Sequence, residues 1–99
     1  MKLAVIGAGP GGYVAALKAA RSGADVTVIE DTEVGGTCLN RGCIPTKALL
    51  ASSEAYTRAT ELGDFGVEVS GTITPNFAKM MARKNKVVEI QVKGIRGLF

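Results

Sequence analysis

The chain has 99 residues, of which 46% are hydrophobic and 21% are charged, and its formal net charge is +3. This length accommodates one domain at most, and no apolar run approaches the roughly twenty residues of a membrane span. A charge this mild, without aromatic or motif support, gives no nucleic-acid signal, so we expect neither a nucleic acid nor a membrane as a partner.

Residues 2–30 predict a strand, a tight glycine turn, a helix and a second strand. Lys2–Ile6 is a short apolar run, and the alanine-rich Tyr13–Arg21 has strong helix propensity. Pro10 suits the start of that helix, where its missing N–H costs nothing, and Gly23 ends it. Asp25–Glu30 then reads as a second, buried parallel strand that ends in an acid.

The glycines between the first strand and the helix fit a dinucleotide-binding pattern. Gly7 allows the turn, Gly9 lets the backbone approach a pyrophosphate, and Gly12 lets helix and strand pack closely. The helix N-terminus would face the phosphates, and Glu30 has the spacing expected of a carboxylate that binds ribose hydroxyls. The alternative is a glycine-rich turn in an α/β domain whose site is empty or binds phosphate only.

Cys38 and Cys43 stand five residues apart. In an α-helix that separation displaces residues by about 7.5 Å along the axis, whereas a disulfide needs Cα atoms roughly 4.4–6.8 Å apart. The sulfurs can therefore bond only if the backbone between them is not regular helix. Gly42 supplies conformational freedom, and Pro45 is tolerated only in a first turn, so we expect a helix to begin near Gly42 or Cys43.

A cysteine at a helix N-terminus points to redox chemistry. The partial positive charge there favours a thiolate on Cys43, and Lys47, one turn further along, adds a full charge. Two cysteines without a histidine are too few for a zinc site, so we expect no metal. A structural disulfide would suit a secreted domain, but Met1-Lys2 leads directly into a strand-like run rather than a signal peptide. Two unrelated buried thiols remain an alternative.

The second half of the chain is less informative. A helix is expected over Ala48–Glu61, a break at Gly63–Gly66, a short strand at Val67–Val69 and a long amphipathic helix over Pro75–Leu98. Burial is predicted for Leu49, Leu50, Ala55, Tyr56, Ala59, Phe77, Met80, Met81, Val88, Val92 and Ile95. The cations Lys79, Arg83, Lys84 and Lys86 are expected to face water.

Together, these motifs resemble those of the flavin-dependent pyridine nucleotide-disulfide oxidoreductases. The resemblance rests on Gly7–Tyr13, Glu30 and Gly35–Leu50. Glutathione-type members typically carry two lysines after the proline, whereas Thr46–Leu50 resembles the lipoamide branch. Arg41 stands where many members carry valine.

The resemblance implies an α/β fold, namely an incomplete Rossmann-like FAD-binding domain. A βαβ unit with parallel strands would be followed by a redox-active-disulfide helix and a long amphipathic helix. Residues 1–99 would form the N-terminal part of that domain, with the nicotinamide-binding and dimerisation domains absent. Because a two-strand sheet leaves apolar edges uncovered, we expect either a fragment of a longer product or self-association.

The same resemblance implies roles for individual residues. Cofactor binding would fall to Gly7, Gly9, Pro10, Gly12, Glu30, Gly36, Thr37, Cys43 and Lys47, and catalysis to Cys38, Cys43 and Lys47. Cys43 would lie over the flavin ring as the charge-transfer thiol, and Cys38 would exchange with substrate. Lys47 would sit near the reactive edge of the flavin.

The implied activity is oxidation of dihydrolipoyl groups by thiol–disulfide exchange, with electrons passing through FAD to NAD. The implied partner is the lipoyl-carrier domain of a 2-oxo acid dehydrogenase complex or a related system. A homodimer is expected at full length, in the cytoplasm. The alternatives are a non-catalytic, truncated dinucleotide-binding module, or a segment of another family reductase of the mercuric or glutathione type.

Overall fold

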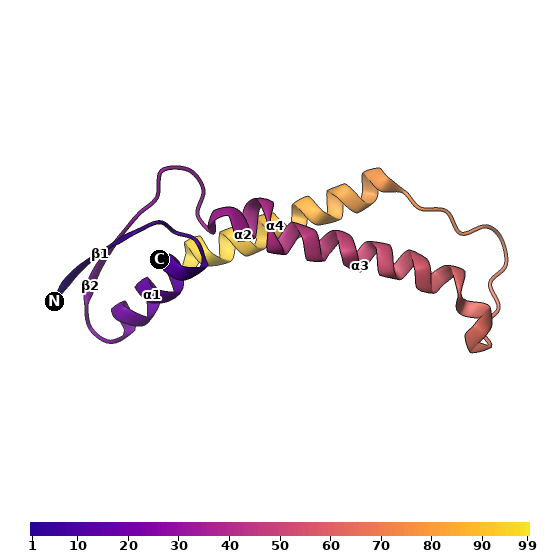
Figure 1. Ribbon diagram of the computed structural model, residues 1–99, viewed down its shortest axis with the longest axis horizontal. Helices are drawn as coiled ribbons and strands as arrows, with labels where there is room; N and C mark the ends of the chain where they lie inside the picture. Colours follow the sequence, from indigo (N-terminus) through magenta and orange to yellow (C-terminus); the bar gives the residue numbers. More distant parts are fainter.

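A computed structural model describes residues 1–99 and shows a mixed α/β chain (Figure 1). In chain order, its elements are β1 (Lys2–Ile6), α1 (Pro10–Arg21), β2 (Asp25–Ile29), α2 (Gly36–Arg41), α3 (Cys43–Thr60), the 3₁₀ helix η1 (Leu62–Phe65) and α4 (Phe77–Leu98). This order confirms the predicted βαβ unit, followed by a helix that begins at Cys43 and a long C-terminal helix. None of the helices combines the length and hydropathy that a bilayer crossing requires.

The N-terminal unit is a two-stranded parallel sheet with α1 as its crossover. β1 and β2 pair in register from Lys2 opposite Asp25 to Ile6 opposite Ile29. Helix α1 begins at Pro10, as predicted, because proline is well suited to a first helical position. Gly23, with φ of +92°, turns the chain after the helix into β2.

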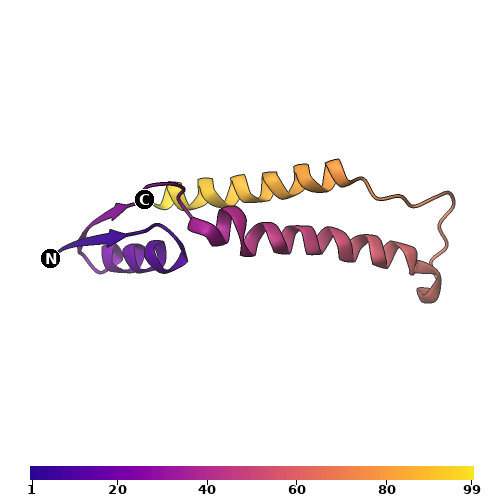
Figure 2. The same ribbon diagram turned by 45° about the horizontal axis from the view of Figure 1, so that its top comes forward.

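Helices α3 and α4 form a long antiparallel hairpin that projects from this unit (Figures 1 and 2). The molecule measures 63 × 25 × 17 Å, and its radius of gyration is 19.3 Å, against about 13 Å for a compact domain of this length. The two helices are tied by Arg83, whose Nη1 donates to the Ala48 carbonyl oxygen at 3.3 Å. The C-terminal end of α4 returns to the βαβ unit, beside α1 and β2.

The core is small and centred on the junction between the two parts. Six of the 99 residues are buried, namely Ala8, Ala16, Gly35, Leu39, Pro45 and Ala48. The prediction that the second strand is buried was wrong, because its residues alternate between half-buried and exposed and no third strand covers them. The open sheet agrees with the sequence-based expectation of uncovered apolar edges.

Several burial predictions for the hairpin also fail. Phe77 is 70% exposed and Leu50 54% exposed, because each helix of a two-helix hairpin has only one partner surface to bury against. Ala55 and Tyr56 are exposed as well, whereas Met80 and Met81 are half-buried as expected. Lys84 is half-buried rather than turned to water.

The connection between the hairpin helices contains no strand. Residues 67–69 were predicted as a strand, and this prediction was wrong because no neighbouring strand lies beside them to supply a hydrogen-bonding ladder. Helix α4 begins at Phe77, two residues after Pro75. Asn76 caps it, and its Oδ1 accepts from the Lys79 N–H at 3.0 Å.

Candidate cofactor and redox site

The glycine turn after β1 requires glycine at two positions. Gly7 has φ of +97°, and its N–H donates to the Ile29 carbonyl oxygen at 2.7 Å, which joins the turn to β2. At Gly12, a Cβ atom would overlap the Gly7 carbonyl oxygen and lie 2.8 Å from the Gly7 carbonyl carbon. The third glycine of the predicted pattern therefore allows α1 to pack against the turn.

The first turn of α1 presents free donors at this site. The Tyr13 N–H bonds to the Gly9 carbonyl oxygen, while the N–H groups of Gly11 and Gly12 donate no hydrogen bond within the protein. Pro10 has no N–H and begins the helix. Unpaired backbone donors at a positive helix end are the arrangement that binds phosphate groups, so these residues fit a dinucleotide diphosphate.

Glu30 is fixed by the backbone around it. Its Oε2 accepts from the Ala8 N–H at 2.7 Å, and its Oε1 accepts from the N–H groups of Asp31 and Thr32 at 3.0 and 3.1 Å. The hydrogen bond from Ala8, followed by those from Thr32, lowers the pKa of Glu30 to about 2. The carboxylate is therefore charged at neutral pH and attached to the glycine turn, a contact that the sequence did not reveal.

We expect Glu30 to make stability depend on acid pH. Its folded pKa of about 2 lies below its ordinary value of 4.5, so the unfolded chain binds the proton more readily. The resulting stabilisation is complete above pH 4.5 and is lost as the pH falls toward 2. Urea unfolding followed by circular dichroism at several pH values measures this loss.

Glu30→Gln should flatten that acid dependence, because the amide side chain does not titrate. Glu54→Gln is the matched control, since Glu54 is exposed on α3 and makes no hydrogen bond. An acid dependence that persists unchanged in Glu30→Gln would contradict the assignment to Glu30.

The glycine turn contacts the segment that carries the first cysteine. The Gly35 N–H donates to the Ala8 carbonyl oxygen at 2.8 Å. Gly36 has φ of +63°, and a Cβ atom there would lie 2.8 Å from the Gly9 Cα. Thr37 follows in the exposed first turn of α2. The glycine turn and the dithiol segment are therefore in direct backbone contact, which their spacing in the sequence alone did not indicate.

The two cysteines meet across a break between two helices. Cys38 lies in α2, Cys43 is the first residue of α3, and Gly42 separates the helices. A Cβ atom at Gly42 would lie 3.0 Å from the Thr37 carbonyl oxygen and 3.2 Å from the Cys38 Cα, so glycine allows this close approach. The predicted start of a helix at Cys43 is confirmed, and the expected interruption of regular helix between the cysteines falls at Gly42 alone, whereas the short helix α2 was not predicted.

Both thiols are free, with Cys38 half-buried and Cys43 exposed. A hydrogen bond with the Cys43 side chain raises the pKa of Cys38, and burial adds to the rise. The Cys43 N–H and the charge of Lys47 act in the opposite direction on Cys38. Cys38, Cys43 and Lys47 thus form one interacting group, in which Cys38 holds its proton more tightly than an isolated cysteine.

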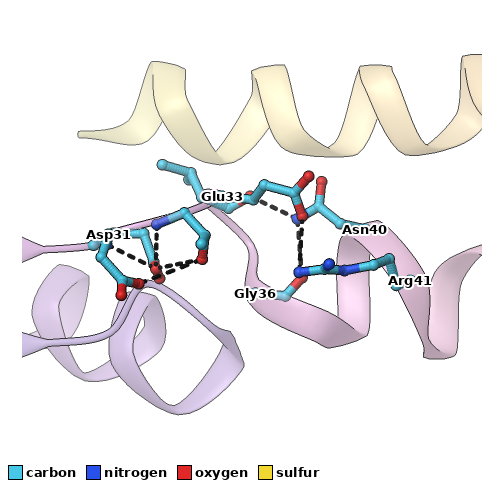
Figure 3. A network of polar contacts seen from close by, with 8 residues as sticks. Asp31, Glu33, Gly36, Asn40 and Arg41 are labelled. Carbon is cyan, nitrogen blue, oxygen red and sulfur yellow. Dashed lines mark hydrogen bonds and ion pairs between the residues drawn. The ribbon is translucent and has the colours of Figure 1, made fainter.

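Polar contacts between α2 and the preceding loop complete the site (Figure 3). The Asn40 Nδ2 donates to the carbonyl oxygens of Val34 and Gly36 at 3.0 and 2.9 Å. Arg41 forms an exposed ion pair with Glu33 at 3.4 Å. No spacing pattern in the sequence pointed to Asn40, because its partners are backbone carbonyls.

Comparisons with known proteins show relatives that share one name. The chain is 52% identical over 95 residues to a dihydrolipoyl dehydrogenase of Chlamydia trachomatis, covering 96% of this chain and 20% of that protein. It is 46% identical over 100 residues to a dihydrolipoyl dehydrogenase of Bacillus subtilis, covering 100% of this chain and 22% of that protein. The chain thus spans about a fifth of the length of these curated relatives.

A solved structure extends the likeness to three dimensions. It is described as the Cu(II) complex of the HOCl-induced flavoprotein disulfide reductase RclA from Escherichia coli. Its TM-score is 0.73 at 28% sequence identity, and the match covers 99% of this chain and 19% of that one. The family model described as Pyridine nucleotide-disulphide oxidoreductase matches residues 1–96. The chain belongs to the pyridine nucleotide-disulphide oxidoreductase family.

Proposed function

We propose that this chain is the FAD-binding, redox-disulfide segment of a dihydrolipoyl dehydrogenase, the N-terminal part of an incomplete FAD-binding domain. One observation carries the proposal: the glycine turn and the dithiol segment are joined by the contacts of Ala8 with Gly35 and of Gly9 with Gly36. A nucleotide on the first would therefore lie next to the thiols on the second. Relatives with this name and up to 52% identity support the substrate class.

The residues of the site fit FAD as the nucleotide. Free N–H groups at the start of α1 would bind the diphosphate, within the turn made by Gly7, Gly9, Pro10 and Gly12. Glu30 would accept from ribose hydroxyls, and Gly36 and Thr37 would contact the middle of the cofactor. When bound, FAD would take up the electron pair of the dithiol and pass it to NAD.

The chain's own chemistry is thiol–disulfide exchange. A dihydrolipoyl thiolate would attack Cys38 of the oxidised pair, which forms a mixed disulfide and releases Cys43 as a thiolate. The second dihydrolipoyl thiol would then attack its own partner sulfur, which releases Cys38 and closes the lipoyl disulfide. Lys47 would stabilise the negative charge that develops on Cys43, because its cation lies one turn along the same helix.

The proposal extends to partners. The dihydrolipoyl group would be supplied by a carrier domain of a 2-oxo acid dehydrogenase complex, and the complete enzyme would be a homodimer. A redox role for both cysteines, rather than a structural disulfide, supports a cytoplasmic location. The open sheet and small core also support the alternative of a dinucleotide-binding module without turnover.

An anaerobic titration distinguishes a dihydrolipoyl dehydrogenase segment from a dinucleotide-binding module without turnover. The purified chain is equilibrated with FAD, freed of unbound FAD and mixed with excess dihydrolipoamide. We expect FAD to be retained and its visible absorbance to bleach as the dithiol reduces it. Retention without bleaching would favour the non-catalytic module, and failure to retain FAD would contradict the proposal.

A further inference from the structure

Asn40 is a side chain of the dithiol helix α2 that makes two hydrogen bonds, one to the loop before the helix and one to the first residue of the helix itself. Its Nδ2 reaches the carbonyl oxygen of Val34 at 3.0 Å and that of Gly36 at 2.9 Å (Figure 3). Both amide hydrogens are therefore in use, and the side chain is half-buried. Asn40 bridges the last residues of the loop and the first turn of α2.

The loop that Asn40 fixes is also the one that contacts the glycine turn. Between Val34 and Gly36 lies Gly35, whose N–H donates to the Ala8 carbonyl oxygen at 2.8 Å. Gly35 and Gly36 have φ of +95° and +63°, a conformation that favours glycine, and the Gly36 N–H donates to the Glu33 carbonyl oxygen at 3.1 Å. The bond between the Leu39 N–H and the Gly35 carbonyl oxygen is long, at 3.4 Å.

Asn40 also lies in the same short helix as Cys38, two residues before Gly42. Because α2 has only 6 residues, its own backbone hydrogen bonds hold it weakly. The position of the Cys38 sulfur relative to Cys43 therefore depends on the tertiary contacts of α2, namely the buried Leu39 and the side-chain bonds that join α2 to the loop. The Arg41–Glu33 ion pair contributes little, since its side chains are 67% and 49% exposed.

We propose that Asn40 is a positioning residue that sets both the approach of Cys38 to Cys43 and the contact of the dithiol segment with the nucleotide turn. This inference rests on the proposed function. The Asn40 amide, whose hydrogen-bond partners are carbonyl oxygens rather than thiols, holds the dithiol segment against the nucleotide turn.

The test measures the equilibrium between the dithiol and its disulfide. Oxidised glutathione accepts two electrons from the Cys38–Cys43 pair, so that one protein disulfide forms and two glutathione thiols are released. Asn40→Ala removes both hydrogen bonds while raising helix propensity. We expect the equilibrium constant for disulfide formation to fall about tenfold, which corresponds to a shift of about 30 mV toward a more oxidising potential.

Two control variants isolate the amide. Asn85→Ala makes the same change at an exposed position of α4 where the side chain has no hydrogen bond, and Glu33→Gln breaks the ion pair of the same loop. Both should alter the equilibrium constant less than twofold. A tenfold effect of Glu33→Gln, or none of Asn40→Ala, would overturn the proposal.

Folding and cofactor binding are followed in the same samples. Asn40→Asp keeps the shape but turns a carboxylate toward two carbonyl oxygens, and should exceed the effect of Asn40→Ala. If both variants lose the helical circular dichroism signal, Asn40 is a general folding residue and the inference fails. FAD affinity should fall together with the thiol equilibrium, and an unchanged affinity would refute the coupling. Wild-type protein that binds no FAD yet shows the thiol effects would refute the proposed function alone.

Discussion

Replacing Cys43 with serine is expected to stop thiol–disulfide exchange at the first mixed disulfide. In the wild-type chain, Gly42 alone separates the end of α2 from Cys43, and a Cβ atom at Gly42 would lie 3.2 Å from the Cys38 Cα, so the two cysteines are close together. An intramolecular thiol at such a distance displaces the mixed disulfide far faster than a thiol from solution. We expect release of the second thiol from a small aromatic disulfide to slow by at least about 100-fold in Cys43→Ser.

The measurement follows thiol release from an excess of the reduced chain by absorbance, with mass spectrometry to identify the adduct. The wild type should release both thiols and end as an internal disulfide, whereas Cys43→Ser should retain the adduct on Cys38. Cys38→Ser is the reciprocal variant and should retain the adduct on Cys43. Rapid release of both thiols by either variant would show that the two sulfurs do not resolve each other.

Loading with FAD then distinguishes the roles of the two cysteines. If Cys43 lies against the flavin, Cys38→Ser protein loaded with oxidised FAD shows a long-wavelength thiolate–flavin band, because its remaining thiolate faces the oxidised ring. Cys43→Ser protein loaded in the same way shows no such band. The exposure of Cys43 at the start of α3 leaves its sulfur accessible to such a ring, whereas Cys38 is half-buried. A band that survives in Cys43→Ser would reverse the assignment.

Prolines and glycines in the sequence predicted the turn of the site and the starts of α1 and α3, because these features depend on the backbone of individual residues. Pro10 and the glycines around it predicted the turn and the start of α1, and Pro45 predicted a helix that begins near Cys43. These residues restrict or free the backbone at their own positions, so their effect does not depend on distant neighbours. The parallel pairing of β1 and β2 followed from the same pattern.

The features that sequence reasoning missed depend on tertiary neighbours. Residues 67–69 have strand-like composition but no partner strand, and Phe77 fits an apolar stripe but meets no surface that would bury it. Helix α2 begins at Gly36, where propensity disfavours a helix, and Asn40 supports it through backbone oxygens. The bond between Glu30 and Ala8 spans 22 residues and appears only once the turn has folded.

Gly12→Ala should have the second large effect, on stability and on FAD binding together. The added methyl would overlap the Gly7 carbonyl oxygen and lie 3.6 Å from a Val5 side-chain carbon. Because the clashing atom belongs to the backbone, the clash can be relieved only if α1 moves away from the turn. Overpacking of this kind costs about 3 kcal/mol of unfolding free energy, and an equal loss of binding free energy would weaken FAD affinity by about 100-fold.

Gly11→Ala is the matched control, since it adds the same methyl one residue earlier. Nothing lies within 4 Å of a Cβ atom at Gly11, and its φ is not in the left-handed region. Alanine there should be neutral or should stabilise the chain by up to about 1 kcal/mol. Urea unfolding and FAD titration of both variants test the packing of α1 on the turn. If Gly11→Ala were damaging and Gly12→Ala were tolerated, a residue other than Gly12 would pack against the turn. The free N–H groups of α1 would then not point toward the site proposed for the diphosphate.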